Sequence, residues 1–279
     1  MSADRTMLAR WTSAIRRRMP ARGGRGAPQH PGQIFVLGNQ KAGTTAIAAL
    51  LAECSDEPFV SDVLYTNKVR LRDVLADRPS LAELAEKHPE SFAATVVKDN
   101  DFVFLYPQLA AQFPNARFLF VVRDPRQNVR SILNRLQIPG DLPELPQEEY
   151  DRLAKKLKGW HGIITGADFG ESGGHYIDVL ADRWIRAART YLDSPEKMTL
   201  VRYEDFDADK RGFIERLARD LGLSVVNDIS TSQDKQYQPR GDREVTPQDF
   251  FGANLERLER RCADLMPRFG YAPLTRLDG

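Results

Sequence analysis

Residues 33–51 decide the fold, and they read Gln33-Ile34-Phe35-Val36-Leu37-Gly38-Asn39-Gln40-Lys41-Ala42-Gly43-Thr44-Thr45-Ala46-Ile47-Ala48-Ala49-Leu50-Leu51. An apolar run of strand length is followed by a loop of small residues with one lysine, and then by an amphipathic helix. Such a loop holds phosphate because its amides point inward and the N-terminus of the next helix adds partial positive charge. The stretch therefore predicts an anion site between a buried strand and a helix.

The loop resembles a nucleotide-binding P-loop, G-x-x-x-x-G-K-[ST], only in part. Gly38 and Gly43 take the glycine positions and Thr45 the final hydroxyl, but Thr44 stands where the template has lysine. The lysine is displaced to Lys41, inside the loop. A kinase needs a lysine on the outer phosphates and usually an acidic strand end for Mg²⁺. The displaced lysine instead indicates anionic oxygen bound by protein cations.

Strand and helix signals alternate from residue 33 onward, which is typical of an α/β fold with a parallel sheet covered by helices. Further strands are expected at 93–97, 117–122 and 198–203, with a short extended piece over 59–65. Helices are expected at 102–113, 125–136, 177–192, 207–222 and 251–265, and two more over 67–88, broken at Pro79. Residues 148–176, rich in glycine, are predicted to be the least regular part of the chain.

The predicted organisation is a basic leader, 1–30, followed by one P-loop-type domain, 31–279, with an inserted irregular or helical lobe at about 138–176. This lobe is expected over the mouth of the sheet and would hold the acceptor. The first 27 residues carry seven arginines against one acid, Asp4. Such a segment could make weak contact with an anionic membrane surface. A solvated leader is favoured because its apolar face is narrow.

The composition gives no reason to expect a nucleic-acid-binding protein, a metalloprotein or a membrane-spanning protein. A net charge of +1 gives no general reason to expect a nucleic-acid partner. Four scattered histidines have no ligand spacing, so no metal site is expected. Cys54 and Cys262 are expected to be buried thiols in a reducing compartment, which favours a cytoplasmic protein. No stretch is apolar enough to span a membrane, and no signal-peptide core is present.

Polar residues follow three further predicted strands directly, as Lys98-Asp99-Asn100, Arg123-Asp124-Pro125 and Tyr203-Glu204-Asp205. In open parallel sheets, ligands collect at the carboxyl ends of the strands. Together with the loop at 38–45, these strand ends predict a nucleotide or anion site.

These residues resemble the motifs of the PAPS-dependent sulfotransferases, which use 3′-phosphoadenosine 5′-phosphosulfate. Lys41-Ala42-Gly43-Thr44-Thr45 is similar to their 5′-phosphosulfate loop, K-[AST]-G-T-[ST]. Arg123-Asp124-Pro125, with Ser131 eight positions after the arginine, resembles their 3′-phosphate motif, R-x-P-x-x-x-x-x-S. Val201-Arg202-Tyr203-Glu204-Asp205-Phe206 is similar to their "YED" strand end. The resemblance covers residues 33–222.

The resemblance implies roles for individual residues. The 5′-phosphosulfate would be held by loop residues, namely Gln40, Lys41, Ala42, Gly43, Thr44 and Thr45. Arg123 and Ser131 would hold the 3′-phosphate, and Tyr203 would lie near the adenine. Arg240 and Gly241 would supply a late basic-glycine element near the 3′-phosphate, although a plain surface turn explains them equally well. No metal is expected, and the product would be adenosine 3′,5′-bisphosphate (PAP).

The expected catalytic residues are Lys41, Lys98 and Asp62. Lys41 would stabilise the leaving group and Lys98 the moving sulfuryl oxygens. Family members that act on phenols and steroids carry a histidine two positions after the lysine equivalent to Lys98, where this chain has Asn100. Members that act on carbohydrates often use a carboxylate soon after the loop helix, and Asp62 is the best-placed candidate. A loop carboxylate or a helix cap remains an equal explanation of Asp62, and Glu57 and His161 are further candidates for the base.

The sequence therefore predicts a sulfotransferase that transfers a sulfuryl group from PAPS to a hydroxyl of a small-molecule or glycan acceptor. A carbohydrate, a glycolipid or a secondary metabolite is favoured over a simple phenol. One alternative is a kinase-like phosphotransferase that uses ATP and Mg²⁺, and another is a relative that binds nucleotide without catalysis. The identity of the acceptor and the oligomeric state stay open.

Overall fold

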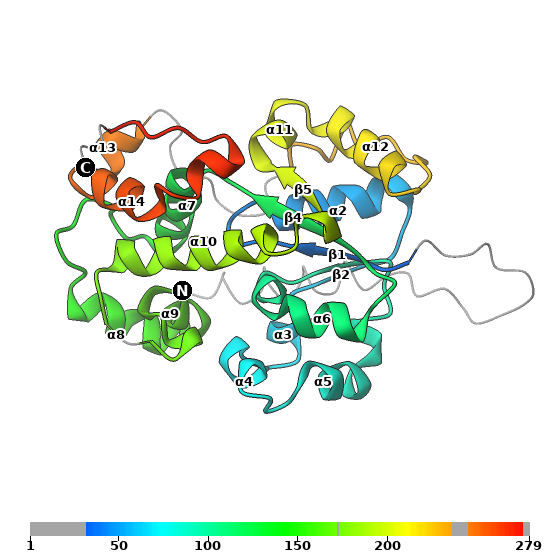
Figure 1. The fold of residues 1–279 in the computed structure, drawn as a ribbon, viewed down its shortest axis with the longest axis horizontal. Helices are drawn as coiled ribbons and strands as arrows, with labels where there is room; N and C mark the ends of the chain where they lie inside the picture. Colours follow the sequence, from blue (N-terminus) through cyan, green and yellow to red (C-terminus); the bar gives the residue numbers. More distant parts are fainter. Residues whose placement is uncertain (1–31, 172, 236–244, 276–279) are drawn as a thin grey trace, which may run out of the picture.

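The computed structural model describes residues 32–171, 173–235 and 245–275, and within them five parallel strands form one sheet (Figure 1). The strand order is β2-β3-β1-β4-β5. The strands are β1 (Ile34–Leu37), β2 (Phe59–Ser61), β3 (Val96–Lys98), β4 (Arg117–Val122) and β5 (Met198–Arg202). The expected α/β fold with a parallel central sheet is confirmed. The expected leader, 1–30, lies outside the described residues.

The first strand lies at the centre of the sheet, which explains its uninterrupted apolar sequence. Ile34 is opposite Val96 of β3 on one side and Arg117 of β4 on the other, and all four residues of β1 are buried. A strand covered on both faces by helices needs apolar residues at every position. The chain continues to β2 and β3 on one side of β1 and to β4 and β5 on the other. In open parallel sheets, ligands bind beyond the carboxyl ends of the strands at such a change of direction.

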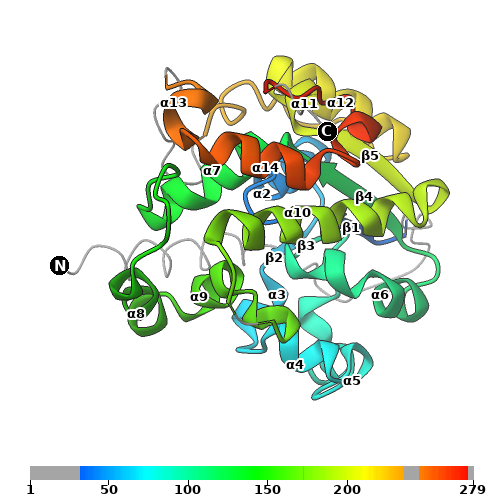
Figure 2. The same ribbon diagram turned by 60° about the vertical axis from the view of Figure 1, so that its left-hand side comes forward.

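Helices cover both faces of the sheet (Figures 1 and 2). On one face α2 (Thr44–Ser55) packs beside α12 (Lys210–Asp220), which follows α11 (Tyr203–Ala208). The core of the other face includes residues of four further helices: α6 (Tyr106–Gln112), α7 (Pro125–Leu136), α10 (Tyr176–Leu192) and α14 (Asn254–Cys262). Cys54 and Cys262 are free and buried in these layers, as expected.

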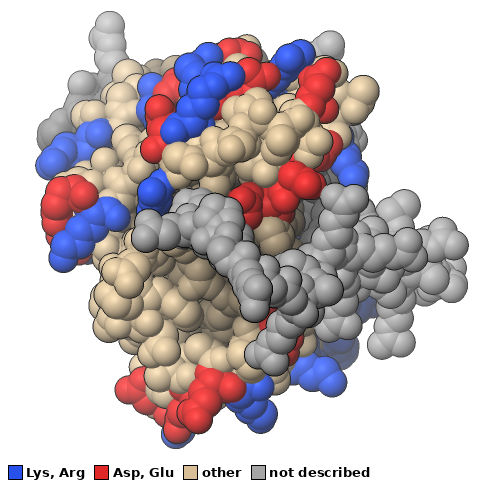
Figure 3. All heavy atoms as spheres, turned by 90° about the vertical axis from the view of Figure 1, so that its right-hand side faces the viewer, with Lys and Arg blue, Asp and Glu red and all other residues tan. Residues whose placement is uncertain are grey.

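The surface mixes charges of both signs. Acidic and basic side chains lie next to one another over the face seen in Figure 3. Helix α12 carries two pairs at helical spacing, Arg211 with Glu215 and Arg219 with Glu215. No helix among the described residues has the length and apolar character needed to cross a membrane.

The insert is more regular than its sequence suggested. Within it lie α8 (Gln147–Lys156), α9 (Lys158–Thr165) and the short 3-10 helix η3 (Ala167–Phe169). The insert is thus helical, one of the two forms expected for it, and residues 148–176 are more regular than predicted. Gly166 and Gly170 adopt left-handed conformations and end helices, so they delimit regular structure instead of preventing it.

Several element boundaries also differ from expectation. Residues 63–65 are not extended but form α3 (Val63–Thr66), because Asp62 turns the chain out of β2 with a φ of 55°. Tyr203 opens α11 instead of ending the strand. The helix expected at 102–113 is divided into η2 (Asp101–Leu105) and α6, and the last helix is divided into α13 (Pro247–Phe251) and α14. The two helices around Pro79 are present as α4 (Leu71–Leu75) and α5 (Leu81–Lys87).

Candidate active site at the carboxyl ends of the strands

The loop between β1 and α2 has the backbone geometry of an anion-binding loop. Lys41 has a φ of 68° and Gly43 a φ of 103°, both in the left-handed region. Alternation of left-handed and ordinary residues turns successive backbone amides toward one side, which forms a concave site for an anion. Lys41 is not glycine, so its conformation costs free energy that the surrounding contacts must offset.

Helix α7 holds this loop through an asparagine that sequence reasoning missed. Asn128 is buried, and its side-chain amide donates to the carbonyl oxygen of Gln40 at 2.8 Å. Its carbonyl oxygen accepts from the Asn39 side chain, also at 2.8 Å. Since α7 begins at the Arg123-Asp124-Pro125 turn, Asn128 links the two motifs that were recognised in the sequence.

Two of the predicted loop ligands have side chains that bond to the protein itself. The Gln40 side chain donates to Asp101 Oδ1 at 2.7 Å, and its backbone amide donates to Asn39 Oδ1 at 3.0 Å. The Thr44 hydroxyl donates to Asn100 Oδ1 at 2.7 Å. Thr44 and Asn100 thereby fix the first turn of α2, where Thr45 is half-buried. Within the loop, Gln40 holds the backbone in place.

A group of cations surrounds the displaced lysine. The pKa of Lys41 is lowered from 10.5 to about 8, first by burial and then by the charges of Arg135, Arg123 and Lys98. Arg135 was not predicted, although it lies one helical turn after Ser131 on α7 and this spacing was a usable signal. Arg135 Nε is buried and has no hydrogen-bond partner among the described residues. The repulsion between these cations and the unbonded Nε of Arg135 are both consistent with an anionic ligand beside Lys41.

Tyr203 lies between the two motifs. The guanidinium carbon of Arg123 is 4.3 Å from the centre of the Tyr203 ring, and Arg123 Nη1 donates to the Lys41 carbonyl oxygen at 3.3 Å. A Cβ at Gly43 would stand 2.3 Å from the same ring. The structure thus brings together Arg123, Tyr203 and the loop, while Ser131 lies half-buried on α7.

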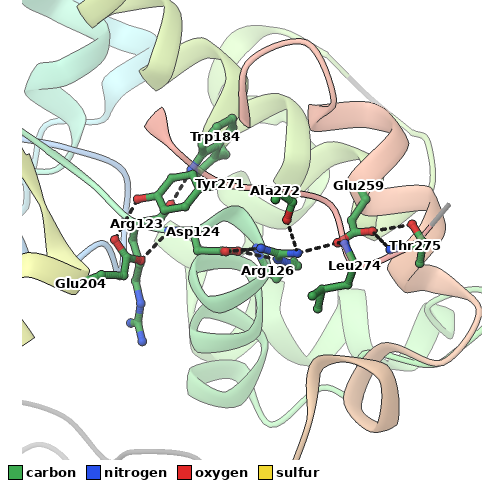
Figure 4. A network of polar contacts seen from close by, with 10 residues as sticks. All are labelled: Arg123, Asp124, Arg126, Trp184, Glu204, Glu259, Tyr271, Ala272, Leu274 and Thr275. Atoms are coloured by element: carbon green, nitrogen blue, oxygen red, sulfur yellow. Dashed lines mark hydrogen bonds and ion pairs between the residues drawn. The ribbon is translucent and has the colours of Figure 1, made fainter. Parts of the chain in front are cut away.

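Side chains of α10 and α11 hold the turn that carries Arg123 (Figure 4). Trp184 of α10 donates to the Arg123 carbonyl oxygen at 2.9 Å. Glu204 of the "YED" segment accepts from the Asp124 amide at 2.9 Å, and the Tyr271 hydroxyl donates to the other Glu204 oxygen at 2.9 Å. Glu204 is therefore a support of the turn.

A buried ion pair extends this support to the last described residues (Figure 4). Arg126 Nη1 lies 2.7 Å from Glu259 Oε1, and Arg126 also donates to the Ala272 carbonyl oxygen at 3.0 Å. Glu259 is fully buried and accepts from the backbone amides of Leu274 and Thr275, each at 2.8 Å. Residues 271–275, which we call the C-terminal strap, are thereby held against the start of α7.

Asp62 and Lys98, which sequence reasoning assigned to catalysis, form an ion pair. The Lys98 ammonium nitrogen lies 2.7 Å from Asp62 Oδ1, with the lysine side chain 2% exposed and the aspartate 48% exposed. The Asp62 side chain makes no capping bond to α3, so the helix-cap reading is not supported. The neighbouring Asp99 is buried, which together with Asp101 and Asp62 raises its pKa to about 7. Asp99 holds α3 through the Leu64 amide at 2.8 Å.

The remaining candidates lie elsewhere. Glu57 precedes β2 and accepts from the Thr95 hydroxyl at 2.7 Å, so it is at the opposite end of that strand from Asp62. His161 is half-buried on α9 of the insert. Arg240 and Gly241 lie outside the described residues. In the part of the chain that the structure describes, no three His, Cys, Asp or Glu side chains are grouped in a way that could hold a metal ion.

A comparison with protein-family models decides the family. The model of the sulfotransferase family matches residues 70–228, more than half of the chain. The chain belongs to the sulfotransferase family. The matched residues include Lys98, Arg123, Ser131 and Tyr203, and the match begins after the loop at 38–45. Membership in this family does not favour the alternative of a kinase-like phosphotransferase.

Four relatives share a quarter or less of their sequence with this chain. Human and mouse protein-tyrosine sulfotransferase 1 are each 24% identical to it over 199 residues, covering 62% of this chain and 54% of theirs. The chain thus spans about half the length of these relatives. Among solved structures, the sulfotransferase domain from the curacin biosynthetic pathway is 13% identical, with a TM-score of 0.49, over 87% of this chain and 98% of that one. Mouse sulfotransferase SULT7A1, complexed with PAP, is 13% identical, with a TM-score of 0.45, over 85% of each chain.

Proposed function

We propose that this sulfotransferase moves a sulfuryl group from PAPS to an acceptor hydroxyl. The observation that carries the proposal is the buried loop lysine, Lys41, whose pKa is lowered to about 8 first by burial and then by the charges of Arg135, Arg123 and Lys98. Nearby like charges disfavour the charged form of a lysine, and a bound anion favours it. A nucleotide with phosphate at both its 3′ and 5′ positions would meet this charge at two places, the loop and the Arg123 turn.

Some residues of the site would bind the nucleotide, and others would act in catalysis. PAPS supplies the sulfuryl group and a leaving group that gains negative charge as the bond to sulfur breaks. Lys41 would stabilise that charge from the loop, and Lys98 would hold sulfuryl oxygens. Arg123 and Ser131 would bind the 3′-phosphate, with Arg135 as an additional cation. Gln40 supports the loop, and Gly43 allows Tyr203 to approach it.

Asp62 is proposed as the base that takes the proton of the acceptor hydroxyl. It is half-exposed, so an acceptor can reach it, and Lys98 fixes its position. Asn100 cannot serve, because an amide takes no proton at neutral pH and its side chain is bonded to Thr44. An aliphatic hydroxyl of a carbohydrate, glycolipid or secondary metabolite remains our first proposal for the acceptor. The similarity to protein-tyrosine sulfotransferase 1 favours a tyrosine hydroxyl as the second candidate.

Two wider proposals accompany this reaction. Residues 31–279 would act as one domain, in which the insert at 138–176 contributes to the acceptor side. The two buried free thiols, Cys54 and Cys262, support a reducing compartment such as the cytoplasm.

A thermal-shift comparison tests the donor. PAP should raise the melting temperature in the presence of a metal chelator, because protein cations alone bind it. Protection by ATP with Mg²⁺ but not by PAP would overturn the proposal in favour of a phosphotransferase. Catalysis is then tested with sulfur-labelled PAPS and a panel of sugars, glycolipids, phenols and tyrosine peptides. Binding of PAP without transfer to any acceptor would instead support a non-catalytic relative.

A further inference from the structure

Arg183 is a buried charged residue that the proposed reaction does not use. It lies on α10, its side chain is 2% exposed, and it is the largest of the fully buried side chains among the described residues. Its Nε donates to Gln40 Oε1 at 2.8 Å, its Nη2 to Asp101 Oδ1 at 2.7 Å and its Nη1 to Asp168 Oδ2 at 3.1 Å. All three nitrogens of the guanidinium group therefore have acceptors.

These three acceptors belong to separate parts of the molecule. Gln40 is in the anion-binding loop, Asp101 follows the end of β3, and Asp168 is in η3 of the insert. Gln40 and Arg183 bond to the same oxygen of Asp101, so the loop, the strand end and the helix form one network. The rings of Phe104 and Phe169 lie 4.6 Å and 5.2 Å from the guanidinium carbon.

The insert is shaped to make this contact. A Cβ at position 162 of α9 would lie 2.2 Å from Asp168 Oδ1, so a larger residue there would force the carboxylate to move. A buried guanidinium group is stable only while its partners remain in place, because an uncompensated charge is costly away from water. A shift of η3 would therefore be opposed by Arg183, and Arg183 would transmit it to Gln40.

We propose that Arg183 is a positioning residue that couples the insert to the anion-binding loop. In this arrangement, the insert helps to set the loop conformation in which Lys41 has its left-handed backbone. The affinity of the loop for a nucleotide then depends on Asp168, a carboxylate outside the nucleotide site. This inference rests on the proposed binding of PAPS, and it adds a link between the donor side and the acceptor side.

The chain offers a matched control one turn further along α10. Arg186 also bonds to a carboxylate of the insert, Glu171, and its guanidinium carbon lies 4.8 Å from the Phe169 ring. Arg186 is exposed, however. Among the described residues, no hydrogen bond connects its partner Glu171 to the loop residue Gln40. A comparison of the two arginines separates coupling to the loop from general attachment of the insert.

The first experiment measures the dissociation constant of PAP by calorimetry, well below the melting temperature of each variant. Arg183→Lys cannot reproduce three directed bonds, so PAP should bind about tenfold more weakly, the effect of losing one bond to a charged group. Gln40→Met, which cuts the loop from an intact Arg183–Asp168 pair, should have a similar effect. Arg186→Lys should stay within about twofold of the wild type.

The second experiment perturbs the insert alone. Asp168→Asn should weaken PAP binding several-fold, whereas Glu171→Gln should leave it unchanged. A role limited to stability would lower the melting temperature of Asp168→Asn without changing its affinity for PAP. Unchanged affinity in folded Asp168→Asn and Gln40→Met would therefore overturn the proposal, even if Arg183→Lys fails to fold.

The outcome also separates this inference from the proposed function. If the wild type binds no PAP, the proposed function fails and the coupling to a nucleotide site fails with it. If the wild type binds PAP and the variants bind it equally well, the proposed function stands and the coupling alone is wrong.

Discussion

The Lys98 ammonium group lies 2.7 Å from Asp62 Oδ1, although 36 positions separate the two residues in the sequence. The pairing follows from adjacent parallel strands, because Ser61 at the end of β2 is opposite Lys98 at the end of β3. One residue later, the left-handed backbone of Asp62 turns its carboxylate to the lysine. The pair thus joins the residue proposed to hold sulfuryl oxygens to the residue proposed to take the proton.

Asp62→Asn should lower kcat by about 10²-fold or more, the usual contribution of a general base. The affinity for PAP should change little, because Asp62 is not among the groups around the loop. Single-turnover transfer from labelled PAPS and calorimetry with PAP measure the two effects. Glu57→Gln, which changes a carboxylate at the other end of β2, is the matched control and should retain full turnover. Near-normal turnover of Asp62→Asn would remove Asp62 as the base.

The affinity for PAP should decrease as the pH rises above about 8. Lys41 has a pKa of about 8 in the free protein, lowered by burial and by Arg135, Arg123 and Lys98. A bound anion favours the charged lysine, so its pKa is higher in the complex and binding takes up a proton. The lysine is already charged below pH 8, and the affinity there should not depend on its titration. Above pH 8 the affinity should fall by up to about tenfold per pH unit.

Calorimetry between pH 7 and 9.5, in buffers of different ionisation enthalpy, measures this proton uptake. Lys41→Ala should abolish transfer and remove the dependence on pH in the same range. A wild-type affinity that stays constant from pH 7 to 9.5 would show that Lys41 does not contact the bound anion.

Gly43→Ala should impair the loop in two ways. The new Cβ would stand 2.3 Å from the Tyr203 ring, and the φ of 103° is unfavourable for alanine by roughly 1–2 kcal/mol. Tyr203 must then move, and it would take Arg123 with it, so PAP affinity should fall at least about tenfold. Gly222→Ala isolates the backbone effect, because that glycine has a φ of 67° and an added Cβ would have no atom closer than 3.7 Å. The control should lose stability but keep its affinity for PAP.

Tyr271→Phe should weaken nucleotide binding from a distance. The Tyr271 hydroxyl donates to Glu204, which in turn accepts from the Asp124 amide. Loss of a bond to a charged group costs about 1.5 kcal/mol of stability. It should also loosen the Arg123 turn, raising the PAP dissociation constant several-fold, with kcat at saturating PAPS unchanged. Tyr191→Phe, which alters a tyrosine stacked on Phe120, should not affect binding.

Features that depend on local sequence could be predicted. The strand β1, the loop and the helix α2 were evident because an apolar run, two glycines and a lysine all lie within residues 33–51. The meeting of Lys98 and Asp62 was also foreseeable, because strand ends in a parallel sheet share an edge. The family resemblance supplied what spacing alone could not, namely the pairing of the loop with Arg123.

Features that depend on tertiary placement were missed. Arg183 falls within the apolar stripe of α10, and nothing nearby in the sequence shows that its partners are Gln40, Asp101 and Asp168. The role of Asn128 could not be predicted for the same reason, because its partners Gln40 and Asn39 precede it by 88 and 89 positions. The helices of the insert are not evident from the sequence, because glycines usually interrupt regular structure, whereas Gly166 and Gly170 end short helices.

The C-terminal strap has a consequence for the order of folding. The contacts that hold the Arg123 turn join residues far apart in the sequence. Asp124 and Glu204 are 80 positions apart, and Arg126 is 133 positions from Glu259 and 146 from Ala272. The last two separations exceed those of the strand pairs in the sheet, which are at most 83 positions. We therefore expect the strap to dock after the sheet has formed, because closing a longer loop costs more entropy. If the proposed nucleotide site is completed at that late stage, PAP should slow the unfolding of the protein without accelerating its refolding.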